Sequence, residues 1–291
     1  MPVETAAREQ AVTAAIREIS HIATLPEITL KIIQLVEDPK STAQDLHQVI
    51  SKDPALCTRI LKVVNSAFYG LPGQIGSINR AIVLLGLNAV KNIAIAASLT
   101  KLFKGGDLAA GFSPKSLWTH SVAVGAASRM IATTMKLGVT DEAFLAGLLH
   151  DVGIMVELQF DRNKLGEVLT KYEAGQTNFL AVEEEVFSAN HQDFGSGLCD
   201  KWKFPRPFAC VTGFHHRPLD LPYDQRSLPT MVHIADLLAA TLDSGFKLDL
   251  PSTEISSDVL DQLKLTREQI ESVRLGLPDA IKEIGTMLSP A

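Results

Sequence analysis

Apolar residues recur every three to four positions along most of this chain, and period-two alternation is nearly absent. The first spacing is that of an amphipathic α-helix, whereas alternation is typical of a half-buried strand. Apolar runs such as AIVLLGL and AIAASL are short and bounded by polar residues. The pattern therefore predicts an all-α protein in which many helices share a core.

Local signals mark where several helices should begin. Asp53 and Ser113 each precede a proline, which suits an N-cap followed by the first helical position. Capping boxes are expected at Ser41 with Gln44 and at Thr266 with Gln269. Six apolar residues inside the expected helices should be buried: Leu61, Val64, Ile82, Leu85, Leu148 and Leu149.

The stop signals divide the chain into three regions. Residues 1–104 form an N-terminal helical subdomain, which should pack closely on the next region. The segment KGGDLAAGFSP, residues 104–114, contains three glycines and a proline and is the best candidate connection. Residues 115–241 form a helical core, and residues 242–291 form a C-terminal tail with one or two helices.

Composition and charge narrow the classes of partner. The net charge is −6 and the pI about 5.8, a bias opposite to that of a non-specific nucleic-acid binder. No apolar run reaches membrane-spanning length, and the start, MPVETAAREQ, does not resemble a secretion signal. Three cysteines without a paired-thiol motif suggest reduced core thiols. We therefore expect a cytoplasmic protein with neither a membrane nor a nucleic acid as partner.

Candidate chemistry is concentrated in residues 115–241, where histidines and aspartates fall in apolar, helical surroundings. A buried polar group is costly unless it is bonded or bound to an ion, and imidazole and carboxylate are the usual ligands of first-row transition metals. The candidate metal ligands are His120, His150, Asp151, His191, His215, His216 and Asp236.

The ligand set divides naturally into two groups. His120, His150 and Asp236 could hold one ion with Asp151 as a shared carboxylate, and the other three histidines could hold a second ion. One or two divalent ions of iron, manganese, nickel or zinc would suit such donors. The alternative is an ordinary polar core, in which each histidine bonds to a backbone carbonyl. His233, one turn from Asp236, is expected to do just that.

The order of these residues resembles a known superfamily. His120, then His150-Asp151, then Asp236 is similar to the HD superfamily of metal-dependent phosphohydrolases. The additional His191 and the pair His215-His216 resemble its HD-GYP branch, which hydrolyses cyclic di-GMP. That likeness implies an HD-like helical core and a metal site.

The N-terminal half resembles a different member of the superfamily. DPAL at residues 53–56 and VNSAFYG at 64–70 are similar to the HDOD family, the HD-related output domain of bacterial signalling proteins. Two segments of the second half, HQDFG at 191–195 and WKFP at 202–205, also resemble this family. The likeness covers about residues 19–240. It implies a regulatory module that acts through a signalling protein partner, with a retained metal site and no or weak hydrolase activity.

The alternative is a metal-dependent phosphohydrolase, either a phosphodiesterase or a nucleotide hydrolase, with a nucleotide or phosphate ligand. Retention of all the ligands favours this enzyme. Three departures from the HD-GYP pattern favour the regulator: Ile154 replaces a lysine, Ser116 replaces a carboxylate used for a third metal, and the glycine-tyrosine-proline loop is missing. Tyr223 follows a proline but does not restore that loop.

Overall fold

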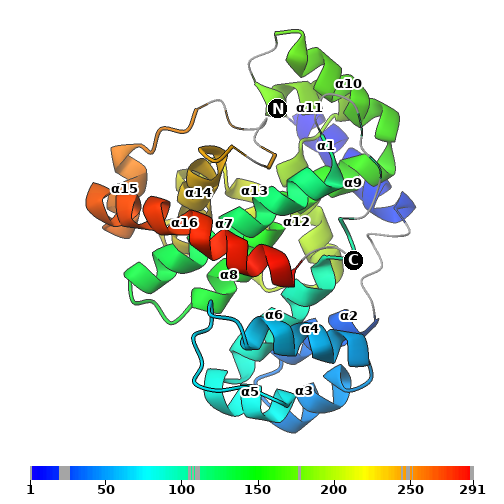
Figure 1. Ribbon diagram of the computed structural model, residues 1–291. Helices are drawn as coiled ribbons and strands as arrows, with labels where there is room; N and C mark the ends of the chain where they lie inside the picture. Colours follow the sequence, from blue (N-terminus) through cyan, green and yellow to red (C-terminus); the bar gives the residue numbers. More distant parts are fainter. Residues whose placement is uncertain are drawn as a thin grey trace.

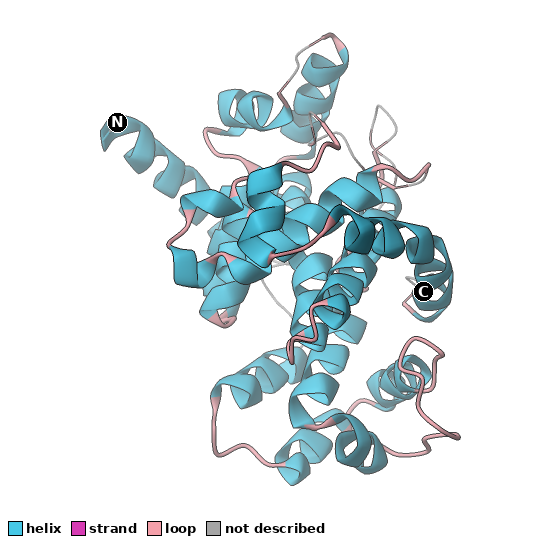
Figure 2. Ribbon diagram, turned by 90° about the vertical axis from the view of Figure 1, so that its left-hand side faces the viewer, coloured by secondary structure: helices cyan, strands magenta, loops and turns pink. Residues whose placement is uncertain are grey.

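The protein is all α-helical, as the periodicity predicts. The computed structural model describes residues 2–19, 27–103, 106, 108, 112–175, 178–243, 245–246, 250 and 252–288. Within these ranges no residue is in a β-strand (Figure 2). Most of the expected connection at 104–114 lies outside the described residues.

Five helices form one group around α6, in the lower part of Figure 1. They are α2 (Glu27–Glu37), α3 (Ala43–Ile50), α4 (Pro54–Val64), α5 (Ile78–Leu85) and α6 (Leu87–Leu99). Helix α6 packs against the other four, and its residues from Ala89 to Leu99 are all buried. We call residues 27–103 the α6 region.

The second group surrounds α7 and α12. Its helices are α7 (Pro114–Thr134), α8 (Thr140–Leu149), α9 (Val152–Phe160), α10 (Arg162–Glu173), α11 (Phe179–Phe187), α12 (His191–Trp202), α13 (Arg206–Phe214) and α14 (Ser227–Ala240). Two short 3-10 turns, η1 (Pro218–Asp220) and η2 (Tyr223–Gln225), connect α13 to α14. Helix α7 packs against α8 and α14, while α12 packs against α9 and α13. We call residues 112–246 the α7 region.

The terminal helices pack on the α7 region. Helix α1 (Pro2–Glu18) lies against α9 and α12, although it precedes the α6 region in sequence. Helix α16 (Arg267–Met287) lies along α7 and touches α4, and α15 (Ser257–Leu263) packs on α14. The three-part division of the chain stays a prediction. Because α1 packs on the α7 region, the N-terminal subdomain would better begin after this helix.

Most expected helix starts are confirmed. Asp53 accepts a hydrogen bond from the Leu56 N–H, and Ser113 forms a capping box. The box at Thr266 with Gln269 is also present. The box expected at Ser41 is wrong by one residue: Thr42 caps α3 with Asp45, because this pair offers the same chemistry one position later.

The turn after α4 is held by Asn65. Its side-chain amide donates to the carbonyls of Leu61 and Ile75, both at 2.8 Å, and its oxygen accepts from the Ile75 N–H. Asn65 is also the C-cap of α4. Gly70 adopts φ +59° at the end of the following turn, a conformation that favours glycine.

The expected core is largely confirmed. Val64, Ile82, Leu148 and Leu149 are buried, whereas Leu61 and Leu85 are only partly buried at the margin of the core. The described segment Thr140–Phe160 has the length and apolarity to cross a membrane, but 89% of its most apolar window is buried inside the protein. Helices α8 and α9 are thus accounted for as core helices.

Candidate metal centre

Five separate segments bring the seven candidate ligands to one place in the α7 region. His120 comes from the middle of α7, and Asp236 from α14. His150 and Asp151 occupy the turn between α8 and α9. His191 is the first residue of α12, and the pair that follows α13 completes the cluster: His215 and His216.

The first half of the cluster joins α7, α14 and the α8–α9 turn. His120 Nε2 lies 2.9 Å from Asp236 Oδ1, and His150 Nε2 lies 3.1 Å from Asp151 Oδ2. The crossed distances, His120 Nε2 to Asp151 Oδ2 and His150 Nε2 to Asp236 Oδ1, are both 3.8 Å. Two imidazoles therefore face two carboxylates.

Asp151 also takes part in the second half through its other oxygen. Its Oδ1 lies 3.2 Å from His215 Nε2 and 3.7 Å from His191 Nε2. His191 Nε2 is in turn 3.1 Å from His216 Nε2. Asp151 therefore lies between the two groups with one oxygen toward each, which is the position of a bridging carboxylate.

The ring orientations leave acceptor atoms facing acceptor atoms. Burial, together with the neighbouring His216, lowers the pKa of His215 well below its usual value, so this imidazole is neutral. Its Nδ1 lies 3.2 Å from the Val211 carbonyl oxygen and donates its hydrogen there. The Nε2 lone pair then points at Asp151, a contact between two acceptors that a cation would relieve.

Several polar atoms of the cluster have no hydrogen-bond partner among the described residues. They are buried and comprise both carboxylate oxygens of Asp151 and of Asp236, with Nε2 of His120 and of His215. Leaving such atoms unsatisfied costs several kcal/mol in an apolar interior. The donor atoms form three overlapping sets, and within each set the atoms lie within 4.8 Å of one another. The donor set suits a metal site, while the role of each residue as a ligand stays a prediction.

Both aspartates are held ionised. Burial opposes the charge on Asp151, but the imidazole of His150, with that of His191, outweighs it and holds its pKa well below the usual value. Burial likewise opposes the charge on Asp236, and His120 and His150 lower its pKa to about 2. The cluster thus presents two buried negative charges to any ion that enters.

A second layer of side chains fixes the ligands. His191 Nδ1 lies 2.9 Å from both carboxylate oxygens of Glu183 on α11, so His191 directs Nε2 to the cluster. Glu157 on α9 lies behind Glu183, and burial, with Glu183 second, raises its pKa well above the usual value. With its amide oxygen turned toward the turn, Gln192 accepts from the backbone N–H groups of His215 and His216, both at 3.2 Å.

Sequence reasoning missed Glu183 and Glu157. A signal for Glu183 exists, because Phe179, Val182, Glu183 and Val186 have the i, i+3, i+4, i+7 spacing of one helix face. Of the three consecutive glutamates at 183–185, Glu183 is therefore the one on the core face. Glu157 has no comparable signal, since its helix is apolar on all sides.

Glycines allow the helices of the cluster to touch. A Cβ on Gly153 would lie 1.8 Å from the His191 carbonyl oxygen, so α9 and α12 meet backbone to backbone beside two ligands. A Cβ on Gly147 would lie 2.7 Å from the Cα of Gly125, where α8 crosses α7. These contacts set the spacing of the segments that carry His150 and His191.

The residues that depart from the HD-GYP pattern have other roles. Ile154 is fully buried in the core. Ser116 completes the capping box of α7, its hydroxyl accepting from the Ser113 N–H at 3.0 Å. Tyr223 is 72% exposed on η2. His233 Nδ1 lies 2.7 Å from the His215 carbonyl oxygen, in the backbone-bonded role expected for it.

Comparison with known proteins bears on the family of this chain. The model of the family described as "HDOD domain" matches residues 22–218. A protein of Treponema pallidum (strain Nichols), described as uncharacterized, is 26% identical over 253 residues. The match covers 86% of this chain and 48% of that protein, so the chain spans about half the length of this relative.

Solved structures share the fold over nearly the whole chain. An HDOD domain protein of unknown function from Geobacter sulfurreducens has a TM-score of 0.70 at 24% identity, covering 94% of this chain and 98% of that one. A candidate signal transduction protein from Marinobacter aquaeolei VT8 reaches 0.76 at 22% identity, covering 98% and 66%. A candidate phosphohydrolase from Shewanella amazonensis SB2B reaches 0.73 at 21% identity, covering 95% and 98%. Since the family model matches more than half of its length, this chain belongs to the HDOD domain family.

Proposed function

We propose that this protein is a regulatory module whose His/Asp cluster binds one or two divalent transition-metal ions and whose α6 region contacts a signalling protein. The observation that carries the proposal is the near-complete burial of the cluster. Six of the seven candidate ligands are 0–1% exposed, and His216 is the least buried. A hydrolase must bring a phosphoester to its metal ions, and a sealed site suits a structural or sensing role better.

The regulator needs a physical route from the cluster to the α6 region. Helix α8 ends immediately before His150 and packs against α6. At the other end of α8, Asp141 accepts from the Tyr69 hydroxyl at 3.0 Å and from Arg129 at 2.8 Å. The Arg129 guanidinium also lies over the ring of Phe68, 4.4 Å from its centroid.

These contacts give the VNSAFYG segment a role at the junction. Phe68 and Tyr69 belong to the α6 region, while Arg129 lies on α7, the helix that carries His120. A bound cation would neutralise the facing carboxylates and favour one spacing of α7 and α8. The Arg129–Asp141–Tyr69 contacts would pass that spacing to the α6 region, provided that the ion binds two conformations unequally.

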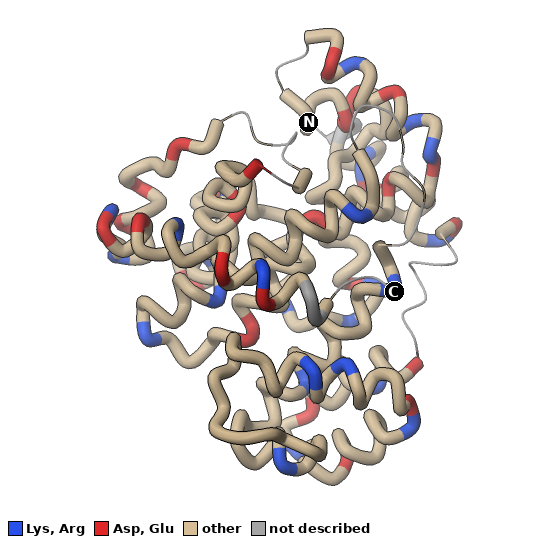
Figure 3. Tube along the Cα trace, in the orientation of Figure 1, with Lys and Arg blue, Asp and Glu red and all other residues tan. Residues whose placement is uncertain are grey.

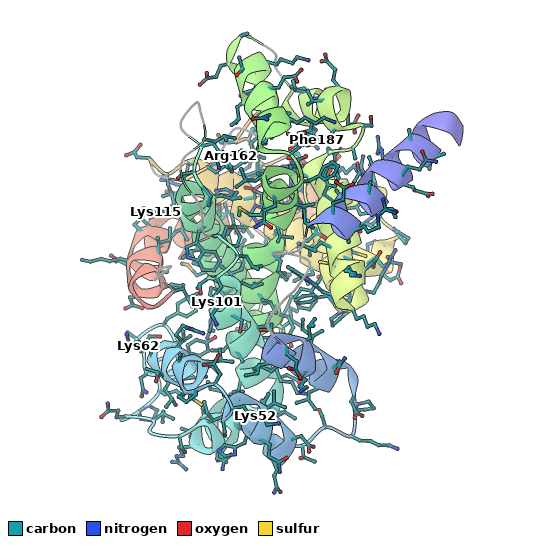
Figure 4. The ribbon with its side chains drawn as sticks, turned by 90° about the vertical axis from the view of Figure 1, so that its right-hand side faces the viewer. Lys52, Lys62, Lys101, Lys115, Arg162 and Phe187 are labelled. Carbon is teal, nitrogen blue, oxygen red and sulfur yellow. The ribbon has the colours of Figure 1, made fainter. Side chains whose placement is uncertain are left out.

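The charge of the α6 region supports an acidic partner. Residues 27–103 contain eight Lys or Arg and five Asp or Glu, a net charge of +3, whereas the whole chain carries −6. Lys52, Lys62 and Lys101 are exposed on this region (Figure 4). Lys and Arg positions are coloured blue on its helices in the lower part of Figure 3. Val83 is 73% exposed on α5. An acidic protein surface with an apolar centre would complement this combination.

The phosphohydrolase remains the rival function, since all the candidate ligands are present. Metal analysis of the purified protein, followed by turnover of cyclic dinucleotides and bis-p-nitrophenyl phosphate, separates the two. The regulator predicts bound metal and turnover far below the rate of about 1 per second that is typical of enzymes. Turnover at that rate, lost in both His150→Ala and Asp151→Ala, would establish the enzyme instead.

A further inference from the structure

A cavity lies where the two regions meet, apart from the His/Asp cluster. Its volume is about 440 Å³, within the range of sites that hold small organic ligands. Helix α6 forms one wall through Asn88 and Asn92, and the start of α8 forms another through Glu142. Helices α13 and α14 close it with Phe208 and Met231. None of the seven candidate ligands lines this cavity.

The lining is mainly apolar, with a few polar groups at defined places. Phe208 is 5% exposed and Met231 is fully buried, so their side chains form the inner wall. The Asn92 side chain is 4% exposed and lies against the Glu142 carboxyl group. Cys210, also buried, directs its thiol toward the Gln225 amide oxygen at 3.5 Å. The cavity is thus a shaped apolar space with one polar wall.

The charged residues of the lining are acidic on balance. The lining contains two carboxylates, Glu142 and Asp224, and only Arg206 is cationic among its described residues. Arg206 is exposed and lies beside Cys210, while burial raises the pKa of Glu142. A carboxyl group that is partly removed from water gains most from a cationic partner that also donates hydrogen bonds.

We propose that this cavity binds a small organic cation, an amine or amidine on a flat apolar body, with the cationic group against Glu142 and the body against Phe208 and Met231. The site is independent of the metal centre as a binding site. Its regulatory consequence rests on the proposed function: α8 leads to His150, α13 leads to His215, and Met231 precedes Asp236 on α14. A ligand between these helices would bear on the spacing of the metal ligands.

Three probes of one shape test the proposal. Benzamidine, benzamide and benzoate share a ring and differ in charge, and the methyl group of Met231, labelled with ¹³C, reports binding. We expect a saturable shift with benzamidine, at least about tenfold weaker binding of benzamide, and no response to benzoate. Glu142→Gln should weaken benzamidine binding by about tenfold or more, whereas Glu254→Gln, at an exposed position, should not.

The site proposal is overturned if Met231 does not respond to benzamidine, if the three probes bind equally, or if Glu142→Gln keeps full affinity. The titration is run on chelator-treated and on metal-supplied protein. If the metal-supplied protein binds no metal but Met231 still responds to benzamidine, the cavity site is supported and the proposed metal centre is refuted. A change in benzamidine affinity on adding metal would support the coupling between them.

Discussion

The buried charged groups Lys91 in the α6 region and Asp151 and Asp236 in the α7 region differ in how they are satisfied. In the α6 region, Lys91 is 2% exposed, and its ammonium group donates to the Leu35 carbonyl and, at 2.7 Å, to the Ser41 hydroxyl. In the α7 region, Asp151 and Asp236 are fully buried, and their oxygens have no hydrogen-bond partner among the described residues. The first arrangement is satisfied by the chain itself, whereas the proposed metal ion would complete the second.

This difference distinguishes a buried group that stabilises the fold from one that suggests a binding site, without reference to any sequence motif. A buried polar group that is satisfied by its own chain contributes to stability, and removing its partner costs free energy. A buried carboxylate left without a donor is retained at a cost, which suggests a ligand that the chain itself does not supply. In the proposed function, the α7 region binds the metal and the α6 region responds to it.

The largest effect on the free energy of unfolding is expected where α9 and α12 touch. Gly153→Ala would place a Cβ 1.8 Å from the His191 carbonyl oxygen and 2.8 Å from the Gly195 nitrogen, both rigid backbone atoms. We expect a loss of more than about 3 kcal/mol in the free energy of unfolding. Gly166→Ala on α10, where nothing lies within 4 Å, should instead stabilise by about 0.5–1 kcal/mol. Urea denaturation of both variants measures this, and equal stabilities would refute the close crossing.

The next largest effect is on metal-dependent stability. Asp151→Ala removes the carboxylate that faces both halves of the cluster, so metal content should fall most in this variant. Metal at a hundredfold excess over Kd should raise the wild-type free energy of unfolding by about 2.7 kcal/mol. The same addition should leave Asp151→Ala unchanged, while the exposed control Asp279→Ala should behave as wild type. Mass spectrometry of bound metal and thermal melts provide the comparison, and metal-induced stabilisation that survives in Asp151→Ala would contradict it.

A smaller effect is expected in the α6 region. Lys91→Met keeps the aliphatic part of the side chain but removes both hydrogen bonds of the ammonium group. Two acceptors then lose their donor, at a cost of about 1–2 kcal/mol in the free energy of unfolding. The exposed control Lys62→Met should change stability little. Metal content should be normal in both variants, and a metal-free Lys91→Met protein would erase the distinction between the regions.

The smallest effect is a change in the pH dependence of stability when Glu157 is replaced. Its raised pKa means that the folded state holds a proton that the unfolded state has released above its ordinary pKa. The stability contributed by this proton is complete below the unfolded pKa and declines as pH rises toward the folded one. Glu157→Gln removes this titration, so in chelator-treated protein its stability should fall less with rising pH than that of wild type. Parallel pH curves from melts at pH 5 to 8 would show that Glu157 is ionised in the fold.

Local chemistry predicted much of the fold from the sequence. Asp53, Ser113 and Thr266 cap their helices with their own side chains, and such contacts depend on only a few neighbouring residues. The position of α1 could not be predicted in this way. It depends on Gly197 of α12, where a Cβ would lie 2.5 Å from the Val12 side chain, a contact between residues far apart in sequence.

The same distinction between local and long-range contacts applies to the candidate site. His150 and Asp151 stand out because of their residue types in an apolar helical setting, and the structure places both in the cluster. Glu183 and Glu157 are charged residues whose burial depends on which helices pack around them. The cavity near Glu142 needs four helices to form and leaves no pattern in the chain.

The central claim is that metal in the α7 region alters the α6 region, and hydrogen exchange measures this directly. Amide exchange is compared with and without metal in wild type and in Asp151→Ala. The regulator predicts metal-dependent protection in the ligand-bearing helices and also across residues 65–70 and 87–99, with neither change in Asp151→Ala. Protection confined to the ligand-bearing helices, with no change across residues 50–99, would contradict the account.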